Sequence, residues 1–130
     1  MGMYTELVLK CGITKEIDDE AHNVLMHIFG EGEKPNKLPS HKFFDTTRWS
    51  FIAKTSSFYH IPFPLSNYCN VLDSDKKGGH IFSRSDFKNY ESELNLFIDW
   101  IMPYIDEYPG RCIGWSWYEE DDSPTLIYKK

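Results

Sequence analysis

The chain has 130 residues, enough for one domain with an ordinary core that needs no metal or disulfide to hold it together. Apolar residues make up 41% of it and charged residues 26%, which excludes disordered and collagen-like proteins. With 14 Lys and Arg against 20 Asp and Glu, the net charge of −6 argues against broad nucleic-acid binding, because such proteins present a basic face to phosphates.

The first part of the chain predicts a strand followed by a helix. Residues 3–11 alternate between apolar and polar side chains, as a half-buried strand does. Apolar residues of segment 17–29 follow the spacing of a single helical stripe, and acids in its first turn complement the helix dipole. We expect Gly30 to end this helix in a left-handed conformation. The Gly- and Pro-rich residues 30–48 predict a loop.

Alternation returns in residues 49–57, which predicts a second strand with Trp49 and Phe51 on one face. Residues 58–61 are a weaker candidate for a third strand, and the two prolines that follow cannot lie in the middle of a sheet. Residues 68–72 and 80–84 flank a polar, Gly-containing stretch, which predicts a β-hairpin.

The second helix carries the clearest signals. Asn89 is placed to cap its start, and Pro103 should kink or end it near Met102 because proline lacks the N–H that the helix requires. Its inner stripe consists of five apolar residues, Leu94, Phe97, Ile98, Ile101 and Ile105. Residues 111–118 and 125–128 then predict two strands joined by an acidic turn.

The predicted order is β-α-β-β-β-β-α-β-β, with the third strand doubtful. Neighbouring strands at hairpin spacing favour a single α+β domain over residues 1–130, with a mainly antiparallel sheet and both helices on one face. A split β-α-β arrangement of the ferredoxin-like kind fits this order.

Neither the cysteines nor the histidines form a recognisable catalytic or metal-binding motif. The three cysteines lie far apart in strand-like runs, where each is expected to behave as a small buried hydrophobe; they are Cys11, Cys69 and Cys112. A metal site would need the fold to gather separated side chains, namely His41, Asp45, His60 and His80. No phosphate-binding loop, nucleophile elbow or zinc motif is present. We therefore expect no metal and no cofactor, and an enzyme is the less favoured class.

Cationic and aromatic side chains occur together where elements begin. Arg48 and Trp49 start the predicted strand, and Lys88, Asn89 and Tyr90 open the second helix, where N–H groups and the helix dipole attract anions. A cation beside an aromatic ring can hold a flat or anionic ligand. If the two starts meet at one sheet edge, the N–H groups of residues 90–92 complete such a site.

The last strands add two more aromatic candidates. Trp115 and Trp117 share one face of a predicted strand, where a flat ligand could stack. Each candidate also has a structural interpretation, which is the commoner one for a single residue. The tryptophans would then belong to the core, Asn89 would be a helix cap, and Arg48 would form an ion pair.

Segments spread over nearly the whole chain resemble a group of small proteins carried by phages, prophages and bacteria. They are residues 3–7, 38–41 with Phe44, 48–49, 88–97, 100–101, 103–105, 118–120 and 124–128. The group has no agreed activity, so the resemblance implies a bacterial host and no catalytic residues. Small acidic proteins of this kind often inhibit a host protein or sequester a host signal.

Three classes of function follow. The favoured one is a non-enzymatic binding protein that inhibits a host protein, such as a defence protein. A binder of a nucleotide-like anionic or planar ligand is the alternative, and a histidine-dependent hydrolase is the third.

No apolar run is long enough to cross a membrane and no signal peptide is visible, so we expect a cytoplasmic protein without a membrane partner. Association into a homo-oligomer stays open.

Overall fold

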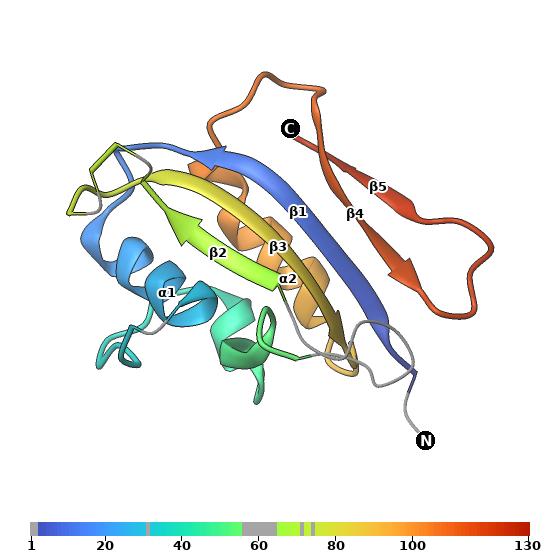
Figure 1. Ribbon diagram of the computed structural model, residues 1–130. Coiled ribbons are helices and arrows are strands. Elements are labelled where there is room, and N and C mark those ends of the chain that lie inside the picture. Colours follow the sequence, from blue (N-terminus) through green and yellow to red (C-terminus); the bar gives the residue numbers. More distant parts are fainter. Residues whose placement is uncertain (1–2, 31, 56–64, 71, 74) are drawn as a thin grey trace.

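A computed structural model describes residues 3–30, 32–55, 65–70, 72–73 and 75–130 (Figure 1). Its strands are β1 (Thr5–Ile13), β2 (Leu65–Cys69), β3 (Gly79–Phe87), β4 (Cys112–Tyr118) and β5 (Thr125–Tyr128). Its α-helices are α1 (Asp19–Phe29) and α2 (Glu93–Ile101), and short 3₁₀ turns cover Lys42–Asp45, Trp49–Phe51 and Met102–Tyr104. None of the helices in these residues combines the length and the apolar character that a bilayer span requires.

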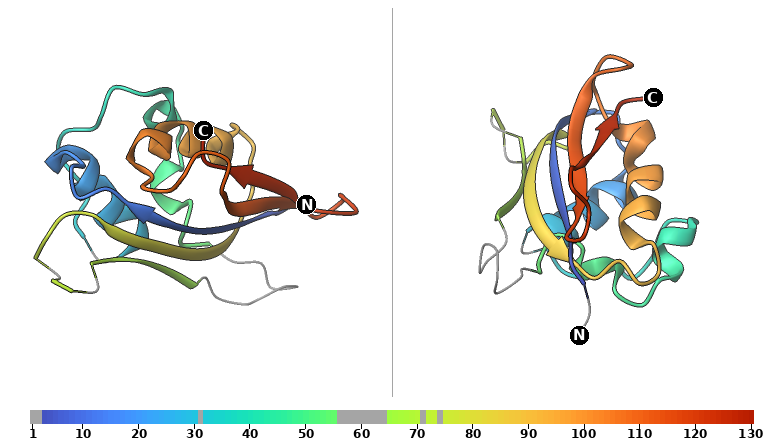
Figure 2. Two further views of the ribbon diagram at one scale, coloured as in Figure 1. Left: turned by 90° about the horizontal axis from the view of Figure 1, so that it is seen from above. Right: turned by 90° about the vertical axis from the view of Figure 1, so that its right-hand side faces the viewer.

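The strands form one sheet in the order β2-β3-β1-β4-β5, and every neighbouring pair is antiparallel. Each helix connects two strands that have a third strand between them, α1 joining β1 to β2 and α2 joining β3 to β4. This is the split β-α-β arrangement of ferredoxin-like folds, with β5 added beyond β4. Both helices lie on the same face of the sheet (Figure 2). The expected α+β class with a mainly antiparallel sheet is confirmed.

The core lies between the helices and one face of the sheet. Alternate residues of β1, from Leu7 to Ile13, are buried against the helices. The helix α1 begins two residues later than predicted, so Ile17 lies just before it. The predicted stripe is nevertheless fully buried; its members are Ile17, Ala21, Val24, Leu25 and Ile28. Asp18 caps α1 through a 2.7 Å hydrogen bond that its Oδ1 accepts from the Ala21 N–H. Gly30 has a φ of −149°, so the left-handed end predicted for this helix is wrong.

The helix α2 begins later than predicted. Its N-terminal cap is Ser92, in a left-handed conformation with φ 58°, while Asn89 accepts a hydrogen bond from the Leu94 N–H at 3.0 Å. Leu94, Phe97 and Ile101 are buried as expected. Ile98 is only half-buried, because it faces a cavity between α2 and the last two strands. The helix gives way to a 3₁₀ turn at Met102, as Pro103 predicted.

The strand predicted for residues 49–57 is wrong over its described part. Trp49 is buried while Phe51 is 52% exposed, so the two do not share a face. The ring of Trp49 packs edge-on against Phe43 and Phe44, with centroids 6.2 and 5.1 Å away. The position of Trp49 is therefore set by its contacts with the 3₁₀ turn Lys42–Asp45, and not by an alternation of faces along a strand. The weaker strand at 58–61 lies outside the described residues.

The remaining strand predictions are confirmed. The expected hairpin is the antiparallel pair β2 and β3, although β2 begins and ends three residues earlier than the run 68–72 and β3 continues beyond Arg84 to Phe87. The strands at the end of the chain pair as β4 and β5, with a bulge between Cys112 and Gly114.

Candidate functional site

The face of the sheet opposite the helices carries an unusual number of apolar side chains. The register places Arg84, Val8 and Trp115 side by side on β3, β1 and β4, and Leu126 follows on β5. We define the open-face patch by six residues on this face: Val8, Phe82, Trp115, Trp117, Leu126 and Tyr128. Phe82 is 56% exposed, Leu126 48% and Tyr128 50%. An antiparallel sheet that faces only water usually carries polar side chains there.

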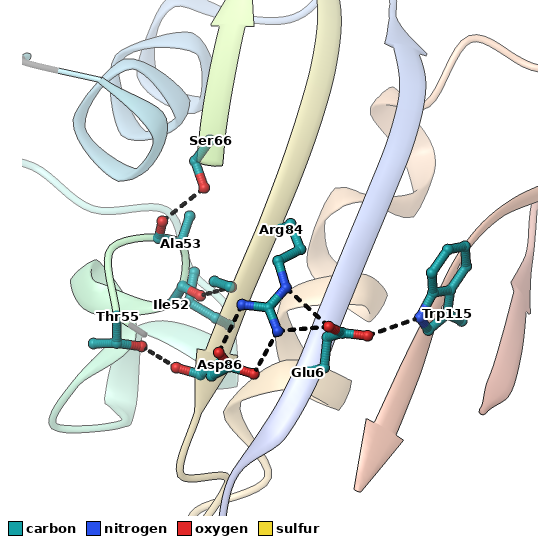
Figure 3. Close-up of polar contacts among 9 residues, drawn as sticks. Glu6, Ile52, Ala53, Thr55, Ser66, Arg84, Asp86 and Trp115 are labelled. Carbon is teal, nitrogen blue, oxygen red and sulfur yellow. Dashed lines mark hydrogen bonds and ion pairs between the residues drawn. The ribbon is translucent and has the colours of Figure 1, made fainter. Parts of the chain in front are cut away.

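A charged cluster in the same face holds one ring of the patch in place (Figure 3). The guanidinium of Arg84 donates two hydrogen bonds to Asp86, at 2.7 and 3.1 Å, and one to Glu6 at 2.8 Å. The second oxygen of Glu6 accepts a hydrogen bond from the indole N–H of Trp115 at 3.2 Å. Glu6 therefore links the Trp115 ring to a buried cation, and this link orients the ring.

Burial by itself lowers the pKa of Arg84, but the hydrogen bonds and charges of Asp86 and Glu6 outweigh burial and raise it. Arg84 and Asp86 are both buried. The guanidinium is therefore a permanent charge, balanced by two carboxylates.

Residues 52–55 are hydrogen-bonded to β3 beside this cluster (Figure 3). The hydroxyl of Thr55 donates to the carbonyl of Asp86 at 2.5 Å, and the Asp86 N–H donates back to the Thr55 carbonyl at 3.1 Å. The Ser85 hydroxyl donates to the carbonyl of Ile52 at 2.9 Å. These bonds hold the segment after Trp49 against β3.

A second group of candidates meets where β3 ends. The guanidinium carbon of Arg48 lies 4.9 Å from the ring centre of Phe87 and 5.2 Å from that of Tyr90. Its Nη2 donates to the carbonyl of Lys88 at 2.6 Å and to the carboxylate of Glu93 at 3.2 Å. The predicted convergence of Arg48, Lys88 and Tyr90 therefore occurs in the structure.

Two parts of the predicted site do not join this group. Trp49 lies in the aromatic core, and Asn89 is used at the start of α2. The N–H groups of residues 90–92 bind acceptors within the chain: Tyr90 donates to the Lys88 carbonyl, Glu91 to the Glu93 carboxylate and Ser92 to the Asn89 carbonyl. The anion site predicted from these amides is therefore wrong, because the chain itself satisfies them.

Trp115 and Trp117 share one face, as expected. They lie on the open face, and the indole N–H of Trp117 donates to the carbonyl of Asp121 at 2.9 Å. The seven candidate residues thus separate into a patch on the open face, a cluster at the end of β3, and two structural positions.

Three of the described histidines contact separate parts of the chain. His22 lies 2.8 Å from the Tyr68 hydroxyl, His27 bonds to the Gly32 carbonyl at 3.0 Å, and His41 bonds to Asp99 at 2.9 Å. His60 lies outside the described residues. Within the described part of the chain, no three His, Cys, Asp or Glu side chains are arranged to hold a metal ion.

The cysteines differ from one another. Cys11 is buried, and burial together with the charge of Glu107 raises its pKa to about 12. Cys69 and Cys112 are exposed, contrary to the expectation that all three are buried. In each strand the neighbouring residue, Tyr68 or Ile113, is buried in the core, so the cysteine lies on the opposite side of the sheet.

Comparison of the chain with protein-family models, curated proteins and solved structures found no match. The arrangement of the described side chains is therefore the basis for a functional proposal.

Proposed function

We propose that this protein is a non-enzymatic binding protein whose open-face patch docks onto a partner protein. The observation that carries this proposal is the exposure of Phe82, Leu126 and Tyr128 on the sheet face that also carries Trp115 and Trp117 and that the helices leave open. Contiguous exposed apolar side chains on a folded domain mark interaction surfaces. Tryptophan and tyrosine are also the residues that contribute most to protein interfaces.

The charged cluster supports this role because it pre-organises the patch. The Trp115 indole is held by Glu6, which Arg84 holds in turn at 2.6 Å. A ring that is already fixed in the free protein loses little conformational entropy when a partner covers it.

The charges around the patch indicate the chemistry of the partner. A cavity of about 310 Å³ beside Trp117 is also lined by four carboxylate residues, Glu6, Asp86, Glu119 and Asp121. The turn between β4 and β5 contains four consecutive acids, and the chain has a net charge of −6. A partner surface with an apolar centre and basic side chains opposite Trp117 would complement this face.

The resemblance to phage-carried proteins supports a bacterial host protein as the partner and the host cytoplasm as the location. Binding that covers a working surface of that protein would inhibit it. A histidine-dependent hydrolase has less support, because His22, His27 and His41 each bond to a different part of the chain.

Site-specific photo-cross-linking in the host cell tests the proposal. A cross-linking residue replaces Phe82 or Leu126 on the open face, and Met26, exposed on α1, serves as the matched control. We expect both open-face positions, and not Met26, to give an adduct with the same protein. Equal cross-linking from Met26, or no adduct from the open face, would contradict the proposal. An adduct with a second copy of this chain would show that the open face binds another copy of the protein and not a host protein.

The purified pair then gives a quantitative test. Trp117→Ala should weaken binding by about 30-fold, the usual effect of losing a tryptophan that contributes strongly to an interface. Met26→Ala should have no effect. Binding should also weaken as salt is added, because the acids around Trp117 steer the basic partner. Unchanged affinity for Trp117→Ala would show that the contact lies elsewhere.

A further inference from the structure

A further cavity lies at the end of the sheet where β1 begins and β3 ends. Six residues line it, namely Tyr4, Arg48, Phe51, Thr55, Phe87 and Lys88, and its volume is about 380 Å³. We call it the cation–aromatic cavity. Its volume is in the range of pockets that hold small organic ligands.

The charges of this cavity are positive. It is lined by two cations, and no carboxylate group of the described residues lines it. Arg48 is partly balanced by Glu93, to which it donates a hydrogen bond at 3.2 Å. Among the described residues, Lys88 has no carboxylate partner, and its ammonium lies 5.3 Å from the ring centre of Tyr4. Lys88 is therefore the group in this cavity that an anion would bind most directly.

The cavity also offers an aromatic surface. Phe51 is 52% exposed, although a phenylalanine gains more by burial than by contact with water. Phe87 is buried, with the Arg48 guanidinium over its ring. Phe51 is therefore the ring on which a planar ligand could stack.

Thr55 adds a polar group of defined direction. Its hydroxyl proton is donated to the carbonyl of Asp86 at 2.5 Å, so the oxygen is left as an acceptor. An acceptor beside a cation and a ring suits a ligand that also carries hydroxyl groups, as a ribose does.

We propose that the cation–aromatic cavity binds a small ligand that joins a phosphate to an aromatic base, of the size of a nucleoside monophosphate. Lys88 takes the phosphate, Phe51 the base, and Thr55 accepts a hydrogen bond from the sugar. The cavity is lined by none of the residues of the open-face patch, so this proposal does not rest on the proposed function. Because the whole chain has a net charge of −6, a single nucleotide fits these charges better than a nucleic-acid polymer.

Calorimetric and NMR titrations with adenosine monophosphate, adenosine and inorganic phosphate test the proposal. We expect the monophosphate to bind at least about tenfold more tightly than adenosine or phosphate alone, because only it engages both the ammonium and the ring. The amide signals of Phe51, Thr55 and Lys88 should shift on binding. No shift up to about 10 mM monophosphate would overturn the proposal. Phosphate that binds as tightly as the monophosphate would show an adventitious ion only.

Single substitutions assign the roles. Lys88→Gln and Phe51→Ala should each weaken monophosphate binding about tenfold, by losing a charge-assisted hydrogen bond and a stacking surface respectively. Lys54→Gln is the matched control, since Lys54 is an exposed cation of the neighbouring turn that does not line the cavity. It should change affinity less than about twofold. A loss for Lys54→Gln equal to that for Lys88→Gln would refute a specific site.

The two proposals can fail separately. Leu126→Asp alters the open-face patch and leaves the residues of the cation–aromatic cavity intact. It should abolish partner binding and leave monophosphate binding unchanged. A loss of monophosphate binding in this variant would contradict the assignment of the ligand to the cavity.

Discussion

Replacing Arg48 with Ala tests whether the ion pair between this cation and Glu93 stabilises the fold. Glu93 is fully buried, and its carboxylate accepts hydrogen bonds from Arg48 at 3.2 Å and from the Glu91 N–H at 2.8 Å. Removing one partner of a fully buried ion pair costs about 3–5 kcal/mol, because the other charge is left without compensation. The Arg48 side chain is 35% exposed, so water can replace part of it. We therefore expect Arg48→Ala to lower the free energy of unfolding by about 2–4 kcal/mol.

Urea unfolding followed by tryptophan fluorescence measures this loss. The midpoint should fall while the slope stays constant, since the surface exposed on unfolding is unchanged. Arg111→Ala is the matched control: Arg111 pairs with Glu107 at 3.2 Å but is 62% exposed, so its loss should cost less than about 1 kcal/mol. Adding Glu93→Gln to Arg48→Ala should recover part of the stability by removing the buried charge. Equal losses for Arg48→Ala and Arg111→Ala would refute a structural ion pair.

Three further predictions concern packing, backbone conformation and thiol reactivity. Phe97 is fully buried among other aromatic rings, so Phe97→Ala should cost about 3–5 kcal/mol in a denaturant titration, and a loss below about 1 kcal/mol would contradict the packing of α2. Gly79 has a φ of +134°, and a Cβ there would collide with the Cys69 carbonyl, so Gly79→Ala should lower thermal stability more than Gly110→Ala, where φ is +90° and the space is open. At pH 8, Cys69 and Cys112 should react with a disulfide reagent and Cys11, whose pKa is raised to about 12, only after unfolding; a third fast thiol would contradict its burial.

The elements that the sequence predicts correctly are those whose pattern depends on one packed face. The stripe of α1 and most of the stripe of α2 are buried because each helix lies on the same sheet surface throughout its length. The conformation of residues 49–53 depends instead on contacts with another segment of the chain. Alternation would put Trp49 and Phe51 together, but the position of Trp49 depends on Phe43 and Phe44, which a local pattern does not report.

The candidate site residues also separate into those with a local signal in the sequence and those whose position depends on the fold. Arg48, Lys88 and Tyr90 were recognisable because a cation and a ring stand at the start of two segments, and the fold brings these starts together. The burial of Glu93 was not recognisable, since an acid in the first turn of a helix is normally exposed. The pair Arg84 and Asp86 has a signal in its spacing, because two opposite charges two residues apart on a strand share a face. Its third member, Glu6, depends on the register between β1 and β3.

The Arg84 cluster is better explained by its effect on the orientation of the Trp115 ring than by a gain in stability. A buried ion pair gains little over well-packed apolar residues of the same size, because desolvation of the charges offsets their attraction. On a sheet face without helices, exposed polar residues would have stayed hydrated and avoided that desolvation. The cluster fixes the orientation of a side chain: Arg84 pairs with Glu6, and Glu6 accepts a hydrogen bond from the indole of Trp115, which lies beside Val8 and Leu126. A ring that is fixed among exposed apolar side chains adds little to folding but lowers the entropic cost of binding, and this supports the proposal that a partner docks on this face.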